Sequence, residues 1–455
     1  MKNKYEQYKR LIMFVLGIMM VGLLSAVYGY VWYKHYLVYL VYPFLGRGNV
    51  LLIFVYAVIL IILLNVYSGF KFGYLRFADL IFSQVICIVI TNVITYFQIS
   101  LIGRSLASLF PMMIMTLVDL VIVGVWSAFA VFVYHKMYPP HNTLMVYGSE
   151  MATSLLRKIK MRPDKYKIKD IVDVNSGLDN VKAHMQGCDA VIICDVKTET
   201  RNKILKYCFE ESIRTYVTPK ISDIIIRGAD DIHFFDTPLL LCRNLGLSFE
   251  EKLMKRVMDI IISSIILVVG SPFMLITAIA IKMYDGGPVF FKQRRCTING
   301  KEFDILKFRS MIVDAEKPGM VIPATDKDPR ITPVGNFIRA TRIDELPQLI
   351  NVLKGEMSIV GPRPERVEHV QKYSEQIPEF AYRLKVKGGL TGYAQIMGKY
   401  NTTAYDKLKL DLMYIENYSI MMDIKLLLMT IKIVFMKEST EGFEVEEQAE
   451  NKKEF

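Results

Sequence analysis

The chain has 455 residues, enough for about two to four domains, and 52% of them are hydrophobic, with a mean hydropathy of +0.29. The net charge of +11 at pH 7 favours an anionic partner, which could be nucleic acid, a membrane surface or a phosphate-rich substrate. Because no helix-turn-helix, zinc-finger or RNA-binding motif is present, we expect no nucleic-acid partner. The six cysteines form no CxxC pair and the six histidines no HxxH pattern, so neither a disulfide framework nor a zinc site is predicted.

Residues 1–137 contain four apolar runs, each near the 20 or so residues that cross a bilayer: about 11–33, 49–67, 80–99 and 111–134. Basic residues gather before the first run and between the second and third, so the positive-inside rule places both ends of this unit in the cytoplasm. Asp119 lies inside the fourth run. It is either functional, because a charge at that depth is costly, or it faces the neighbouring helices.

Residues 138–246 alternate between strand-like and helix-like segments, which predicts a parallel sheet with covering helices. The strands are expected at about 142–147, 166–174, 189–194 and 213–217. The helices are expected at about 149–160, 178–186 and 198–211. After the first strand only Gly148 of a GxGxxG pattern is present, so we expect a degenerate Rossmann-like domain without dinucleotide binding.

A second apolar region follows, with a helix expected at about 256–283. Its apolar core from Ile260 to Ile281 would measure about 33 Å as a straight helix. Gly270-Ser271-Pro272 lies at its middle, and the proline removes one backbone hydrogen bond, so a sharp bend is expected, with Ser271 as a candidate partner for the freed carbonyls. The helix either enters and returns to the same membrane face or makes a kinked fifth crossing. Hydropathy alone favours the crossing.

Two strands, 289–295 and 303–311, are predicted to form a hairpin around Asn299-Gly300. Lys307 and Arg309 alternate with aromatic residues here, and they either bind phosphates or form the solvated face of an edge hairpin. Residues 312–330 are expected to be a loop. The amphipathic segment 404–436 is read either as resting in the membrane interface or as a core helix pair, and the acidic tail 437–455 is expected to be disordered.

The segment from Arg339 to Glu365 holds the candidate chemistry, the adjacent carboxylates Asp344 and Glu345. Apolar residues at helical spacing follow them, and Pro347 is tolerated only in a first turn, so Asp344 is expected at or next to a helix N-cap. The helix start and three flanking arginines, Arg339, Arg342 and Arg363, favour the ionised carboxylate, which can attack phosphorus. The alternative is an ordinary helix start with solvated arginines.

Six motifs in order resemble the bacterial sugar transferase family, the polyprenol phosphate phosphoglycosyl transferases, over roughly 250–436. They are Lys255-Arg256…Asp259, Gly270-Ser271-Pro272, Lys307-Phe-Arg309-Ser-Met311, Arg339…Asp344-Glu345-Leu-Pro-Gln-Leu, Gly361-Pro-Arg-Pro364 and Gly389-Leu-Thr-Gly392. The N-terminal segments resemble the large polytopic branch, which initiates capsule, exopolysaccharide or O-antigen synthesis.

The resemblance implies that a UDP-sugar gives its sugar 1-phosphate to undecaprenyl phosphate, with release of UMP, through a covalent aspartyl intermediate. Asp344 matches the nucleophile and Glu345 its partner, and both are implied as ligands of Mg²⁺. The basic residues implied in substrate binding are Lys307, Arg309, Arg339, Arg342, Arg363 and Lys399. Lys399 stands in Gly398-Lys399-Tyr400 where many members have Gly-Arg-Asn, so a point charge replaces a bidentate fork.

The expected fold is therefore an α-helical membrane domain of four transmembrane helices (1–137), a Rossmann-like α/β domain (138–246) and an α/β monotopic catalytic domain with a re-entrant membrane helix (247–436). The re-entrant reading keeps the catalytic residues beside cytosolic nucleotides. We expect a multi-pass protein of the bacterial plasma membrane, with its N-terminus and catalytic domain in the cytoplasm. The resemblance is also compatible with a homodimer. The rivals are direct transfer with Asp344 only a metal ligand, and an inactive membrane scaffold of a polysaccharide assembly complex.

Overall fold

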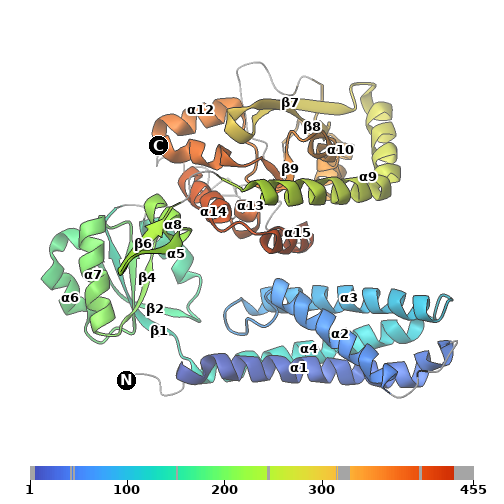
Figure 1. Ribbon diagram of the computed structural model, residues 1–455, viewed down its shortest axis with the longest axis horizontal. Coiled ribbons are helices and arrows are strands. Elements are labelled where there is room, and N and C mark those ends of the chain that lie inside the picture. The colour runs from blue at the N-terminus through green and yellow to red at the C-terminus, as the bar shows by residue number, and fades with distance from the viewer. Residues whose placement is uncertain are drawn as a thin grey trace. The chain divides into compact units, whose positions relative to one another are not determined.

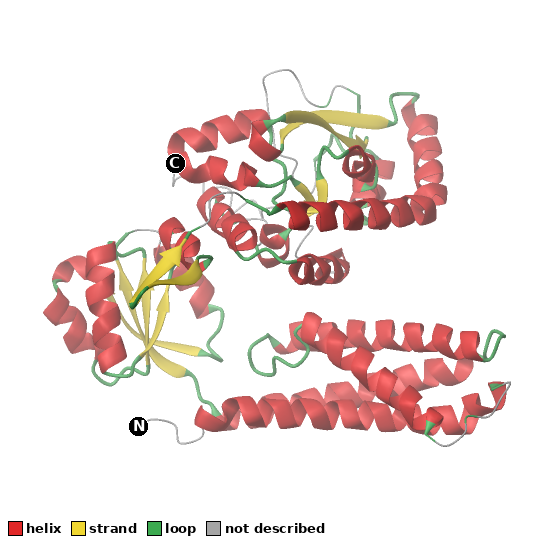
Figure 2. Cartoon of the chain, viewed as in Figure 1, coloured by secondary structure: helices red, strands yellow, loops and turns green. Residues whose placement is uncertain are grey.

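The computed structural model describes residues 6–40, 44, 47–149, 152–242, 246–313, 315, 328–398 and 402–434. The chain forms two compact units, Met1–Thr218 and Pro219–Phe455 (Figures 1 and 2). The predictions for Lys399 and for the tail 437–455 concern residues outside the described ranges, as do those for most of the loop 312–330 and for the end of the segment 404–436.

Four long helices open the first unit at the four predicted apolar runs. They are α1 (Lys9–Val31), α2 (Gly48–Val66), α3 (Phe77–Ile102) and α4 (Phe110–Met137). Including α9 of the second unit, five helices among the described residues are long and apolar enough to cross a membrane. How many of the five cross stays a prediction.

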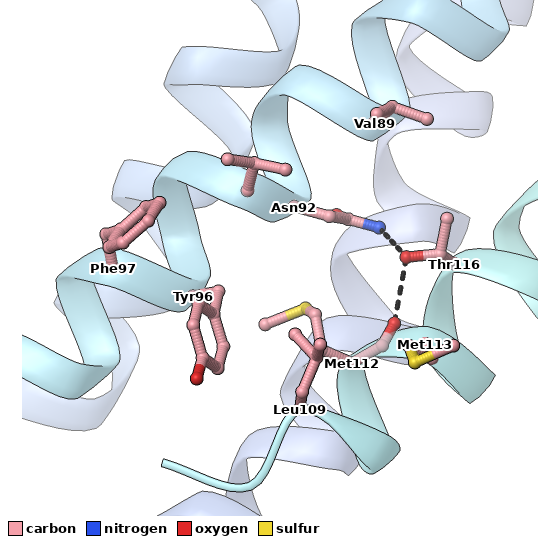
Figure 3. A pocket seen from close by; sticks show the side chains of 9 residues that line it. Val89, Asn92, Tyr96, Phe97, Leu109, Met112, Met113 and Thr116 are labelled. Atoms are coloured by element: carbon pink, nitrogen blue, oxygen red, sulfur yellow. Dashed lines mark hydrogen bonds between the residues drawn. The ribbon is translucent and has the colours of Figure 1, made fainter. Parts of the chain in front are cut away.

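The interior of this helical bundle is polar at the level of Asp119, whose side chain is 0% exposed. Its Oδ2 accepts a hydrogen bond from Asn92 Nδ2 (3.2 Å), and Asn92 Oδ1 accepts one from the Tyr56 hydroxyl (3.1 Å). Asn92 also donates to Thr116 Oγ1 (2.9 Å), at the wall of a mainly apolar hollow of about 320 Å³ between α3 and α4 (Figure 3). Asp119 therefore faces neighbouring helices, the second of its two predicted readings.

The rest of the first unit is the predicted parallel sheet, with strand order β2-β1-β3-β4. The strands are β1 (His141–Tyr147), β2 (Tyr166–Asp173), β3 (Ala190–Cys194) and β4 (Arg214–Val217). The helices are α5 (Ala152–Lys160), α6 (Leu178–Met185) and α7 (Thr198–Glu210). A Cβ on Gly148 would lie 2.6 Å from the carbonyl oxygen of Asp195, so packing within the fold already accounts for this glycine.

The second unit begins with α8 (Ile221–Arg227) and the hairpin β5 (Asp230–Phe234) and β6 (Thr237–Leu241). Residues 219–246 were expected in the middle domain. The structure instead divides at Thr218, because Ile221 and Ile224 of α8 pack into the core of the second unit with Leu412 of α14 (Ala404–Glu416).

The α/β part of the second unit contains the predicted hairpin, β7 (Phe290–Cys296) and β8 (Glu302–Phe308), which pair antiparallel. Asn299 and Gly300 both have positive φ in its turn, which is the reason for the Asn-Gly signal. The remaining elements are α10 (Pro333–Ala340), α11 (Gln348–Lys354), β9 (Ser358–Val360), α12 (Val367–Gln376), β10 (Gly389–Thr391), α13 (Tyr393–Met397) and α15 (Ile420–Val434). Leu408 of α14 and Leu426 of α15 are buried in the core, which favours the core-helix reading of 404–436.

Helix α9 (Phe249–Asp285) has two arms that meet at a sharp bend, with Pro272 inside the helix (Figures 1 and 2). Pro272 cannot donate to the carbonyl of Val268, four residues earlier. Ser271 Oγ donates to that carbonyl instead, at 2.8 Å. The expected bend and the expected partner for the freed carbonyl are therefore both present.

Both arms of α9 are fixed to the same α/β unit. On the first arm, Lys255 Nζ donates to Asp423 Oδ2 (2.6 Å), and Asp259 Oδ1 accepts from the backbone N–H of Ile359 (2.9 Å). On the second arm, Asp285 pairs with Arg309 at the end of β8. The outward side chains are apolar and exposed along most of the helix, among them Ile261, Ile265, Val268, Val269, Phe273 and Ile276.

The ion pair between Lys255 and Asp423 yields a stability prediction. Lys255→Met leaves Asp423 buried without its cation, so the free energy of unfolding should fall by about 3–5 kcal/mol. Thermal unfolding of the detergent-solubilised protein measures the loss. Lys252→Met, which removes an exposed lysine of the same helix, is the matched control. Equal melting temperatures for the two variants would show that the pair contributes nothing.

Candidate active site

The two adjacent carboxylates lie in a short 3₁₀ turn, Ile343–Glu345, between α10 and α11. The expectation that Asp344 stands at or next to a helix N-cap needs correction, because the N-cap of α11 is Pro347. Arg342, before the turn, has φ 55° and ψ 19°, a left-handed conformation that non-glycine residues seldom adopt. The backbone therefore turns sharply before presenting the acid pair.

Glu345 is bound by cations from two separate segments. Its Oε1 accepts hydrogen bonds from Lys307 Nζ of β8 and from Arg363 Nη2 in the loop after β9, each at 2.9 Å. Arg342 Nη1 lies 4.0 Å from Oε2. Burial alone would raise the pKa of Glu345, but the charges of Lys307 and Arg363 outweigh burial and hold this pKa well below its usual value. Glu345 is therefore a fixed negative charge.

Asp344 differs from its neighbour, since no hydrogen bond or ion pair joins its side chain to another residue in the described part of the chain. Burial and the charge of Glu345 raise its pKa to about 6, against the opposing charges of Lys307, Arg339 and Arg363. Arg339 and Arg363 do favour ionisation, as expected, but burial and the charge of Glu345 outweigh them. The carboxyl still ionises near neutral pH, and it has no hydrogen-bond or ion-pair partner among the described residues, as is required of an attacking group.

Arg363 is itself held by a buried pair that the sequence reasoning missed. Arg383 Nη2 donates to the Arg363 carbonyl (2.9 Å), and the same guanidinium pairs with Asp411 Oδ2 (2.8 Å). Both side chains are almost completely buried, and they come from segments without a recognisable motif. Only a structure could have found them.

The glycines around this loop are explained by close backbone contact. β9 and β10 pair in parallel, and a Cβ on Gly389 would lie 2.1 Å from the backbone nitrogen of Gly361. Gly389 N also donates to the carbonyl of Pro362 at 2.8 Å. The Gly-Pro-Arg-Pro and Gly-Leu-Thr-Gly motifs are thus two sides of one contact that places Arg363.

The other predicted site residues lie in different places. Arg309 binds Asp285 and the Pro288 carbonyl, and its side chain is only 7% exposed, so the structure uses it to fix the second arm of α9. Arg339 acts on Asp344 through its charge. Ser271 and Pro272 are at the bend of α9. A Cβ on Gly270, at the same bend, would lie 3.8 Å from Leu346 Cδ1, so the bend adjoins the residue after the acid pair.

Mg²⁺ is the cation that the carboxylates were expected to hold. Among the described residues no group of three or more His, Cys, Asp or Glu side chains is arranged to hold a metal ion. Mg²⁺ binds through one or two carboxylates together with substrate phosphates rather than in an all-protein cage. Two carboxylates alone do not complete such a site, so Mg²⁺ at Asp344 and Glu345 stays a prediction.

Comparison with known proteins gives one family. Residues 250–437 match the family model described as bacterial sugar transferase. The UDP-glucose:undecaprenyl-phosphate glucose-1-phosphate transferase of Escherichia coli K12 is 37% identical over 267 residues, which cover 57% of this chain and 56% of that protein. The protein of the same name from Caulobacter vibrioides is 41% identical over 184 residues, 39% of this chain and 68% of the relative.

A third relative has a different sugar in its name. The UDP-N-acetylgalactosamine-undecaprenyl-phosphate N-acetylgalactosaminephosphotransferase of Aeromonas hydrophila is 43% identical over 183 residues, 40% of this chain and 43% of that protein. The chain thus spans about half the length of several curated relatives that it matches. These similarities show that the chain belongs to the bacterial sugar transferase family, in its large polytopic branch.

Proposed function

We propose that the protein transfers a sugar 1-phosphate from a UDP-sugar to undecaprenyl phosphate, as the first membrane step of surface polysaccharide synthesis. The observation that carries the proposal is the uncommitted carboxyl of Asp344 beside Glu345, which Lys307 and Arg363 hold in place. The names of the relatives contain the same donor and acceptor classes.

The proposed reaction has two displacements. In the first, an Asp344 carboxylate oxygen bonds to the phosphorus that carries the sugar, the bond from this phosphorus to the bridging oxygen breaks, and UMP leaves. In the second, an oxygen of undecaprenyl phosphate attacks the same phosphorus, and the bond to Asp344 breaks. The carboxylate is restored and the product is undecaprenyl-diphospho-sugar.

The surrounding residues supply charge and position. Lys307 and Arg363 fix Glu345 next to the attacking group, and their positive charges attract the diphosphate. Asp344 and Glu345 would hold Mg²⁺ together with the diphosphate, and the ion would neutralise phosphate charge that otherwise repels the carboxylate. Arg339 adds positive charge near Asp344.

The bent helix α9 supports a re-entrant arrangement in the membrane. Asp259 on the first arm and Asp285 at the end of the second arm bind the same α/β unit, through Ile359 and Arg309. A straight crossing would place the two ends on opposite sides of the bilayer. The exposed apolar face would lie in lipid, and the acid pair would meet a lipid phosphate near the headgroups.

The covalent intermediate can be tested with donor alone. Incubation with a reactive UDP-sugar, chosen from a panel, should release UMP and add one phosphosugar to Asp344, detected by intact and peptide mass spectrometry. Asp344→Asn should lower UMP release by at least about 10⁴-fold, as loss of a nucleophile does.

Asp304→Asn, which changes an exposed carboxyl of β8, is the control and should keep the wild-type rate. Turnover without any adduct would favour direct transfer. Full complementation of a deletion strain by Asp344→Asn would favour the inactive scaffold.

The raised pKa of Asp344 predicts a pH dependence. A carboxyl with pKa about 6 is protonated below that pH and cannot attack, so kcat/KM should fall about tenfold per unit below pH 6 and level off above it. Glu345→Gln removes a charge that raises this pKa, so the acidic limb of the variant's residual activity should shift to lower pH. Lys307→Met should shift the acidic limb upward. An unchanged pH profile in both variants would show that the acidic limb does not report the ionisation of Asp344.

Membrane topology supplies an independent test. Reporter tags inserted after residue 137 and after residue 440 should both report the cytoplasm, because a re-entrant α9 returns the chain to the same face. The first tag is the internal reference. A cytoplasmic first tag with an external second tag would mean that α9 crosses the bilayer.

A further inference from the structure

Gln348 has a buried amide that the proposed reaction does not yet use. It is the first residue of α11, three positions after Glu345 and four after Asp344. Its side chain is 2% exposed, and its Nε2 has no hydrogen-bond partner among the described residues. A buried donor without a partner destabilises the folded protein, so its presence needs an explanation such as catalysis or a missing ligand.

The position of this amide points to the acid pair. Side chains in a helix lean toward its N-terminus, so that of Gln348 leans back toward the turn that holds Asp344 and Glu345. α11 packs between β8, which provides Lys307, and α9, whose bend adjoins Leu346. This lean predicts that the unsatisfied donor lies on the side of α11 nearest the proposed reaction site.

Such a donor would have a role that the cations of the site do not fill. Lys307 and Arg363 both direct their short contacts to Glu345 Oε1. A phosphoryl group transferred to Asp344 carries charge on its non-bridging oxygens, and a fixed donor aimed at such an oxygen stabilises the transfer. A neutral amide supplies this hydrogen bond without adding another charge beside Asp344.

We propose that Gln348 is a further catalytic residue whose Nε2 donates a hydrogen bond to a non-bridging oxygen of the phosphoryl group that moves to and from Asp344. The inference rests on the proposed function and adds a substrate contact to it. The same amide has no partner when substrate is absent, which accounts for the unsatisfied donor.

Gln348→Met tests the proposal, because methionine keeps the length of the side chain and removes both polar atoms. The rate of UMP release from the donor sugar that the wild type uses should fall roughly 10²-fold, as for loss of one transition-state donor. The melting temperature of the substrate-free variant should equal or exceed that of the wild type, since an unsatisfied donor has been removed.

Ser263→Ala is the matched control. Ser263 lies on the inner face of α9, which packs against α11, and its buried Oγ also lacks a partner among the described residues. This variant should keep the wild-type rate, so that loss of a buried polar atom at the helix interface is separated from loss of the catalytic donor.

The outcomes separate this inference from the function on which it rests. If the wild type releases no UMP from any UDP-sugar in the presence of undecaprenyl phosphate and Mg²⁺, the proposed function fails, and the role of Gln348 fails with it. If the wild type is active and Gln348→Met retains its rate, only the inference is overturned. A lower melting temperature of substrate-free Gln348→Met would assign the amide a structural role and would also overturn it.

Discussion

The ion pairs of Glu345 with Lys307 and Arg363 are the contacts on which the rest of the site depends. They join three segments that are distant in the sequence: β8, the turn before α11 and the loop after β9. Glu345 is the common member, and without it Lys307 and Arg363 would lose the carboxylate that they share. Because Asp344 is the adjacent residue, the contacts that immobilise Glu345 also restrict the position of the Asp344 carboxyl, the proposed nucleophile.

A second set of contacts connects this centre to the membrane helix. Arg256, on the first arm of α9, donates to the carbonyls of Val352 and Leu353, both at 2.6 Å. Both carbonyls belong to the last turn of α11, and that of Val352 also accepts a hydrogen bond from the backbone N–H of Gly355 (2.9 Å). The helix that follows the acid pair is therefore capped by the membrane helix itself. A displacement of α9 in the bilayer would be transmitted to the site through two hydrogen bonds and the contact at Leu346.

The sequence was sufficient where structure follows from local rules. Hydrophobic periodicity predicted the four long helices and the parallel sheet, Asn299-Gly300 predicted the hairpin turn, and Pro272 predicted the bend. Local patterns could not show that Arg309 binds Asp285, 24 residues earlier, or that Ile221 packs into the second unit. Such contacts depend on how distant segments pack.

The burial that dominates the ionisation of Asp344 also depends on such packing, and it bears on the proposed chemistry. Neighbouring carboxylates repel, so the one that receives the cations ionises first and the other keeps its proton to higher pH. Burial raises the pKa of Asp344 most, and the charge of Glu345, which Lys307 and Arg363 keep ionised, adds to this effect, so the pKa of Asp344 is about 6.

At that value, about nine-tenths of Asp344 is ionised at pH 7. Its carboxylate is more basic than an ordinary aspartate and therefore a stronger nucleophile, yet it is still weakly basic enough to leave phosphorus in a second step. The proposed two-step transfer requires both properties of one group, and burial beside the ionised Glu345 provides them.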